Sequence, residues 1–158
     1  MLVIADTSPL RYLTAIGEVA LLPTIFGQVW VPPVVWEELA NVSAPENVRS
    51  FFESRPPWLQ LKSPRGDSLE AMRADLHQGE RAALALAIEM RADLVLIDEA
   101  AGRREARHLG IRITGTVGVL RLGAERSLIN VPDVLSRLRR SGFYIDDNVL
   151  QSAFEAWL

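Results

Sequence analysis

The 158-residue sequence contains no cysteine, and this absence removes several kinds of chemistry at once. Disulfides, thiolate metal sites and a cysteine nucleophile are all excluded. Histidine is scarce as well, since only His77 and His108 are present, so a histidine-rich zinc site is not expected. Any metal would therefore be held by oxygen atoms, which favours Mg²⁺ or Mn²⁺.

The sequence also lacks a basic excess and a long apolar run. Its formal net charge is −3, unlike the basic composition typical of many nucleic-acid-binding proteins. This counts only modestly against a nuclease, because the acids of a metal site add to the negative total. There is no run of about 18 uninterrupted apolar residues, and the N-terminal segment MLVIADTSPL does not resemble a signal sequence. We therefore expect a soluble, cytoplasmic protein without a membrane span.

Short apolar runs alternate with helical segments, and 49% of the residues are apolar. Strands are expected at residues 2–5, 28–31, 58–62, 94–97 and 111–114. Helices are expected at residues 9–16, 18–26, 32–41, 43–54, 68–76, 79–91, 99–109, 116–125, 131–140 and 146–157, with a loop at 63–67. This alternation indicates an α/β fold with a parallel sheet covered on both faces. We expect one domain over residues 1–158, in which about 126–158 form a helical C-terminal part.

Two aspartates follow apolar strands and are expected at the same edge of the sheet. Asp6 follows LVIA and Asp98 follows LVLI, whereas Asp93 precedes its strand and is expected at the opposite edge. Sites in open parallel sheets form beyond the carboxyl ends of the strands. Each aspartate could instead cap a helix, although Thr7 or Ser8 could cap the first helix in place of Asp6.

Two glutamates lie on the apolar sides of predicted helices. At 100° per residue, Glu38 shares a face with Val35 and Leu39, whereas Glu37 points to solvent. Glu80 lies on the apolar side of its helix and also in the first turn. There the helix dipole favours an anion, and the stabilisation of ~0.3–1 kcal/mol would alone explain its presence.

The four acids together suggest a site for a divalent cation. Two carboxylates about 4 Å apart repel by roughly 4 kcal/mol at an effective dielectric near 20. Converging carboxylates therefore need cations or raised pKa values. Mg²⁺ or Mn²⁺ would relieve this repulsion, activate a water and neutralise charge on a phosphodiester. No nucleophile from the protein is then required.

Five sequence segments, in order, resemble those of a known family: IADTSPL, VWVPPVVWEEL, GERAALALA, ADLVLIDE and LGIRITGTVGVL. The chain resembles PIN-domain proteins, in particular a small prokaryotic subfamily related to VapC-type toxins. The late segment RSGFYIDDNVLQSAF is similar to the C-terminus of that subfamily. The resemblance implies a three-layer α/β/α fold and RNA cleavage dependent on Mg²⁺ or Mn²⁺. Homodimers are common among such proteins, and some are toxins held by an antitoxin protein.

The resemblance also implies roles for individual residues. The catalytic, metal-binding acids would be Asp6, Glu38, Glu80 and Asp98. Ser8 matches a small hydroxyl residue expected to orient Asp6, and Thr114 or Thr116 is expected to play a similar part. Glu99, next to Asp98, is a departure from the family's motif. It could replace or assist Asp98 as a ligand.

Three arginines are candidates for contacts with RNA phosphates. Arg11 follows the first turn, and Arg103 and Arg107 lie four residues apart on the helix after Asp98. A solvated helix face that also carries Glu105 explains Arg103 and Arg107 slightly better.

Three functions are compatible with these observations. The first is a metal-dependent endoribonuclease, of which the toxin of a toxin–antitoxin pair is one form. The second is a PIN-like nucleic-acid-binding or regulatory protein with weak or no catalysis, which the acidic net charge supports. A phosphatase resembling haloacid dehalogenases ranks last, because Ser8 stands where that chemistry requires a second acid.

Overall fold

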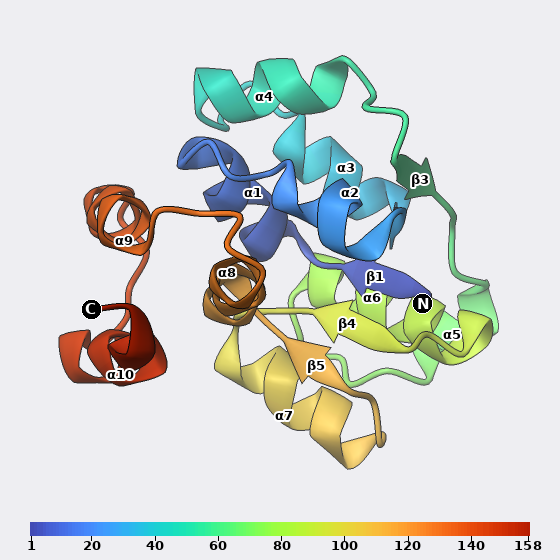
Figure 1. Ribbon diagram of the computed structural model, residues 1–158. Helices are drawn as coiled ribbons and strands as arrows, with labels where there is room; N and C mark the ends of the chain where they lie inside the picture. Colours follow the sequence, from blue (N-terminus) through green and yellow to red (C-terminus); the bar gives the residue numbers. More distant parts are fainter.

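The computed structural model describes all 158 residues and contains one five-stranded parallel sheet, in the order β3-β2-β1-β4-β5 (Figure 1). The strands are β1 (Val3–Ala5), β2 (Val29–Val31), β3 (Leu59–Leu61), β4 (Leu94–Leu96) and β5 (Ile113–Thr114). Helices cover both faces of this sheet. The predicted three-layer α/β/α fold is therefore confirmed.

Ten α-helices connect and follow the strands. They are α1 (Thr7–Ala15), α2 (Leu21–Phe26), α3 (Pro33–Leu39), α4 (Glu46–Glu53), α5 (Gly66–Glu70), α6 (Gln78–Met90), α7 (Ala100–His108), α8 (Thr116–Glu125), α9 (Val131–Arg140) and α10 (Asp147–Ala153). A 3₁₀ turn, Glu155–Trp157, ends the chain. None of the helices combines the length and apolar character needed to cross a bilayer.

Several helix boundaries differ from the sequence prediction, and two of these differences change which residues belong to a helix or to a loop. The N–H groups of Gly17 and Glu18 donate to carbonyls of the last turns of α1, a closure in which Gly17 adopts φ +79°. These residues therefore belong to the end of α1, and α2 begins only at Leu21. The other difference is α5, which begins inside the predicted loop 63–67 and ends at Glu70, well before residue 76.

Alternate residues of each strand face opposite sides of the sheet, as the strand geometry requires. Val3 and Ala5 contribute to the larger apolar cluster, which α1, α2, α3, α4, α8, α9 and α10 complete. Ile4 contributes to the smaller cluster, packed mainly against α6 and α7. Leu150 and Phe154 are fully buried in the larger cluster, so the C-terminal helices share the core of the sheet.

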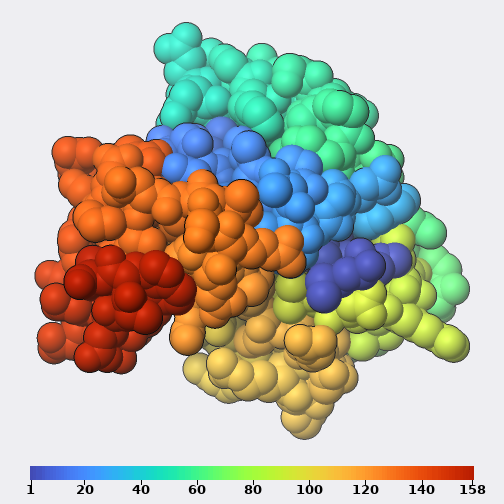
Figure 2. All heavy atoms as spheres, viewed as in Figure 1, coloured from blue at the N-terminus to red at the C-terminus, as the bar shows by residue number.

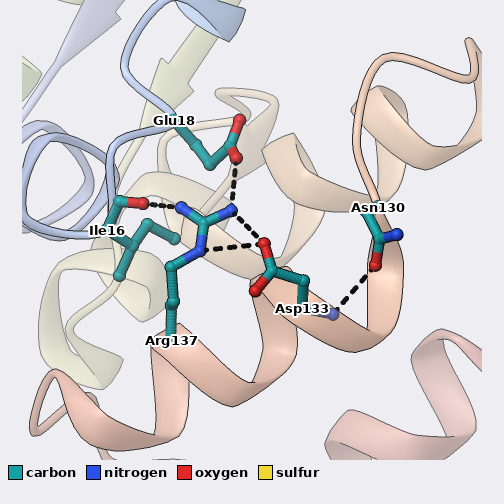
Figure 3. Close-up of polar contacts among 5 residues, drawn as sticks. All are labelled: Ile16, Glu18, Asn130, Asp133 and Arg137. Atoms are coloured by element: carbon teal, nitrogen blue, oxygen red, sulfur yellow. Dashed lines mark hydrogen bonds and ion pairs between the residues drawn. The ribbon is translucent and has the colours of Figure 1, made fainter.

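Arg137 on α9 connects the C-terminal helices to the loop after α1 through a hydrogen bond to Ile16 and an ion pair with Glu18 (Figure 3). Its Nη2 lies 2.8 Å from the Glu18 carboxylate and 3.0 Å from that of Asp133, and its Nη1 donates to the Ile16 carbonyl. The side chain of Asn130 caps the same helix by accepting the Asp133 N–H at 3.0 Å. The guanidinium is thus held by partners within the chain.

Candidate active site

The carboxyl edge between β1 and β4 is the point where the winding of the sheet reverses. From β1 the chain runs outward to β2 and β3, then returns to form β4 on the other side of β1. Ala5 pairs with Leu96, and the Asp6 N–H donates to the Leu96 carbonyl at 2.9 Å. Asp6 and Asp98 therefore leave neighbouring strands at the edge where open α/β sheets form their sites.

A cavity of about 380 Å³ opens at this edge. Its lining consists mainly of acidic and hydroxyl side chains: Asp6, Thr7, Ser8, Arg11, Tyr12, Glu38, His77, Glu80 and Glu99. We call it the acid cavity. The structure thus brings together three of the four acids predicted to form the site, and Glu99 with them.

Two carboxylate oxygens in the acid cavity are buried without a hydrogen-bond partner. Asp6 is 3% exposed and Glu80 is 5% exposed, and the unpartnered atoms are Asp6 Oδ1 and Glu80 Oε2. Asp6 occupies the N-cap position of α1, but its side chain makes no capping hydrogen bond. Helix capping therefore does not explain Asp6. A buried carboxylate oxygen without a partner is costly, so both oxygens are suited to contact a cation.

Two glycines make room for these oxygens. A Cβ atom on Gly79 would lie 2.9 Å from Asp6 Oδ1 and 3.4 Å from Glu38 Oε1. A Cβ atom on Gly102 would lie 2.9 Å from Glu80 Oε2. The carboxylates therefore approach the helix backbones more closely than any larger residue at these positions would allow.

Burial raises the pKa values of both unpartnered acids. The pKa of Asp6 rises to about 7, mainly because the side chain is desolvated. The Thr7 N–H and His77 oppose this rise, whereas the charges of Glu80 and Glu38 add to it. Desolvation also raises the pKa of Glu80, and the nearby charges of Glu99 and Glu38 act in the same direction. A bound cation would reverse both shifts.

The hydroxyl groups after β1 hold acids of the site instead of capping α1. Thr7 Oγ1 donates to Glu38 Oε2 at 2.6 Å, and Ser8 Oγ donates to Asp98 Oδ2 at 2.8 Å. The prediction that Thr7 or Ser8 caps the first helix is therefore wrong. Ser8 also orients Asp98 and not Asp6, because its hydroxyl reaches across to the end of β4.

Asp98 differs from the other three predicted acids because its carboxylate is fully engaged by the protein. Oδ1 accepts the backbone N–H of Thr116 at 2.8 Å, and Oδ2 accepts the Thr116 and Ser8 hydroxyls at 2.7 and 2.8 Å. Asp98 does not line the acid cavity, whereas the adjacent Glu99 does. Thr116 thus supports an acid, but Thr114 makes no side-chain hydrogen bond and packs against Gly118.

The three candidate arginines lie in different surroundings. Arg11 is exposed and lines the acid cavity. Arg103 donates from Nη1 to the Ile97 carbonyl at 3.0 Å and borders a neighbouring cavity. Arg107 is exposed on α7 and lines neither cavity, so only Arg11 is placed to contact a substrate at the acids.

Sequence reasoning gave no role to His77, which lines the acid cavity. It occupies the N-cap of α6, where Nδ1 accepts the Gly79 N–H at 3.3 Å and lies 3.8 Å from Glu38 Oε1. The sequence places His77 three residues before Glu80, just before the same predicted helix, and this spacing could have indicated that both side chains lie at the site.

The fold and the cavity define a three-layer α/β protein with an acidic site at the switch point of its sheet. A family model described as a PIN domain matches residues 2–157, and the chain belongs to that family. The family predicted from the sequence is therefore confirmed. PIN domains are generally nucleases, which act on nucleic acid and typically use divalent metal ions. No curated protein sequence matches the chain.

The donor chemistry of the acid cavity suits such an ion, although the side chains are not preassembled around one. No group of three or more Asp, Glu or His side chains is arranged to hold a metal ion in this conformation. The available donors are nevertheless carboxylate oxygens, which Mg²⁺ and Mn²⁺ prefer. Asp6 Oδ1 and Glu80 Oε2 also lack any other partner. On these two grounds the residues fit a hard divalent cation.

Proposed function

We propose that the protein is a metal-dependent endoribonuclease that hydrolyses RNA phosphodiesters. The observation that carries this proposal is the pair of buried, unpartnered oxygens of Asp6 and Glu80 at the switch point of a PIN-domain sheet. A role as the toxin of a toxin–antitoxin pair, an antitoxin partner and a homodimer are further predictions from the sequence resemblance.

The geometry supports a revised set of ligands for Mg²⁺ or Mn²⁺. Asp6, Glu38 and Glu80 would hold the ion, with Glu99 at the exposed rim of the acid cavity as the fourth acid. Asp98 would act as a positioning residue, because its three hydrogen bonds tie the ends of β4, α1 and α8 together. When bound, the ion neutralises phosphodiester charge and lowers the pKa of a water.

The remaining residues of the acid cavity orient the acids and the substrate. The Thr7 hydroxyl fixes one oxygen of Glu38, leaving Oε1 to face Asp6 across Gly79. The Arg11 guanidinium at the rim would bind a phosphate oxygen of the substrate. The N-termini of α1 and α6, next to Asp6 and Glu80, favour negative charge at this edge.

Cleavage of a labelled single-stranded RNA tests the proposal. We expect activity with Mn²⁺ or Mg²⁺, loss of activity with EDTA, and loss of at least about 10²-fold in Asp6→Asn and Glu80→Gln. Glu37→Gln is the matched control, because Glu37 is exposed and lies outside the cavity. Equal cleavage by the wild type and by Asp6→Asn and Glu80→Gln would trace the activity to a contaminant and defeat the assignment.

Calorimetric titration with Mn²⁺ distinguishes Glu99 from Asp98. We expect Glu99→Gln to weaken Mn²⁺ binding more than Asp98→Asn does, because only Glu99 lines the acid cavity. Asp98→Asn should instead lower the free energy of unfolding, since it weakens three charge-assisted hydrogen bonds. The opposite order of Mn²⁺ affinities would restore Asp98 as the ligand.

A second candidate function is nucleic-acid binding or regulation without catalysis. The observation that favours it is that no three carboxylates are already arranged to hold an ion. A wild-type protein that binds RNA but cleaves no RNA in Mn²⁺ or Mg²⁺ would support this alternative.

A further inference from the structure

A second cavity, of about 400 Å³, adjoins the acid cavity on the side of the C-terminal helices. It lies between the start of α8, Arg103 of α7 and the segment 143–149 that leads into α10. In Figure 2 the C-terminal helices, in orange and red, stand out from the rest of the molecule, and the surface is indented between them and α7. We call it the side cavity.

Two contacts form the wall between the cavities. The Ser8 hydroxyl, which lines the acid cavity, donates to Asp98, which lines the side cavity. The Tyr12 ring of the acid cavity meets the Phe143 ring of the side cavity edge to face, with centroids 5.0 Å apart. The two cavities are therefore neighbours, separated by a single layer of side chains.

The side cavity differs from the acid cavity in its chemistry. Its apolar surface comes from Val117, Phe143, Ile145 and Val149. Tyr144, at its edge, is 98% exposed, so its ring makes almost no contact with the core. Because the Tyr144 ring buries almost no surface, it contributes almost nothing to the stability of the fold.

Of the two charged side chains in the side cavity, Asp98 and Arg103, only Arg103 is free to bind an anion. The oxygens of Asp98 are already engaged by three neutral donors, so they are not free to bind a ligand. The Arg103 guanidinium is anchored through Nη1 to the Ile97 carbonyl, and its other N–H groups make no hydrogen bond within the chain. An anchored guanidinium with free N–H groups is well suited to a phosphate.

We propose that the side cavity binds the base of the nucleotide next to the phosphodiester that the acid cavity holds. Tyr144 stacks on this base, the apolar floor receives its edge, and Arg103 contacts the adjoining phosphate. A volume of about 400 Å³ lies within the range of small-ligand pockets. The substrate is therefore single-stranded RNA or an unpaired loop, because a base within a duplex is not free to enter. This inference rests on the proposed function and specifies its substrate.

The test combines variants of Tyr144 with RNAs in which single bases have been removed. Fluorescence anisotropy in EDTA measures the affinity of labelled single-stranded oligonucleotides, in which each nucleotide in turn is replaced by an abasic one. We expect Tyr144→Ala to weaken binding of the intact RNA by roughly five- to 150-fold. Tyr144→Phe should retain most of the affinity because it keeps the ring. Leu128→Ala, 44% exposed and outside both cavities, is the control.

The abasic series distinguishes the loss of base stacking on Tyr144 from a nonspecific effect of shortening its side chain. One abasic position should weaken wild-type binding by about as much as Tyr144→Ala does, and it should cause little further loss in Tyr144→Ala. Additive losses at every position, or unchanged RNA affinity in Tyr144→Ala, would overturn the inference while a metal-dependent wild-type cleavage activity still stood. A wild type that neither binds nor cleaves RNA would defeat both proposals. Because Tyr144 is almost fully exposed, the substitution should not affect folding.

Discussion

Replacement of Asp6 by asparagine should make the metal-free protein more stable at pH 8 while it removes the proposed metal site. Asp6 is 3% exposed, and its Oδ1 has no partner. Its ionised form is therefore disfavoured in the folded protein relative to the unfolded chain. Asparagine has nearly the same shape and carries no charge, so the penalty for a buried charge disappears.

The size of this effect follows from the pKa of Asp6. The pKa rises from its usual value of 3.8 to about 7 in the folded protein. A raised carboxyl pKa contributes stability that is fully present below pH 3.8 and is lost as the pH rises through about 7. Between pH 5 and pH 8, Asp6 should therefore lower the free energy of unfolding by about 2–3 kcal/mol. In Asp6→Asn this contribution to the fall in unfolding free energy between pH 5 and pH 8 should be absent.

Urea unfolding in EDTA at pH 5 and pH 8, followed by tryptophan fluorescence, measures this difference. The stability of Asp6→Asn relative to the wild type should rise by about 2–3 kcal/mol between the two pH values. At pH 8, Mn²⁺ at about 100 times its Kd should stabilise the wild type by about 2.7 kcal/mol and the variant much less. A stability difference that is the same at both pH values would refute the argument from desolvation.

Three further substitutions test other parts of the structure. Gly79→Ala should lower urea stability modestly, because the close contact with the buried Asp6 side chain outweighs the better helix propensity of alanine. It should weaken calorimetric Mn²⁺ binding by about tenfold or more, since its methyl group would lie 2.9 Å from the Asp6 carboxylate; undiminished affinity would contradict this. Thr7→Val should slow RNA cleavage because Glu38 loses its 2.6 Å hydrogen bond, and Thr7→Ser should restore the rate. Arg137→Met should lower the urea-unfolding free energy by about 2 kcal/mol, whereas a change below about 0.5 kcal/mol would show that its contacts contribute little.

The strands, their parallel direction and the helix face on which Glu38 lies could be predicted because each depends on local pattern. The short apolar runs predicted five strands, and all five are present. Helical phase separated Glu38, which lines the acid cavity, from Glu37, which is exposed. Strand direction likewise predicted Asp6 and Asp98 at the carboxyl ends of two strands, which the structure shows to be neighbours. These inferences needed no knowledge of how distant segments pack.

The hydrogen-bond partners could not be predicted because they depend on distances between segments far apart in the sequence. Ser8 bonds a residue 90 positions away, and Thr7 bonds one 31 positions away. Local spacing suggested only that either hydroxyl could cap α1. The choice between Asp98 and Glu99 is similar, because these adjacent residues point in different directions just after β4. Only the positions of α1 and α8 decide which carboxylate the protein itself engages.

The dispersal of the acid cavity along the chain has a consequence for the timing of its assembly during synthesis. Its acids come from α1, α3, α6 and the start of α7, and the core that supports the sheet includes the buried Phe154 of the last turns. The site therefore forms only after residues 6–154 have all been synthesised. The proposed nuclease activity would thus be absent until the segment through Phe154 can pack against the sheet.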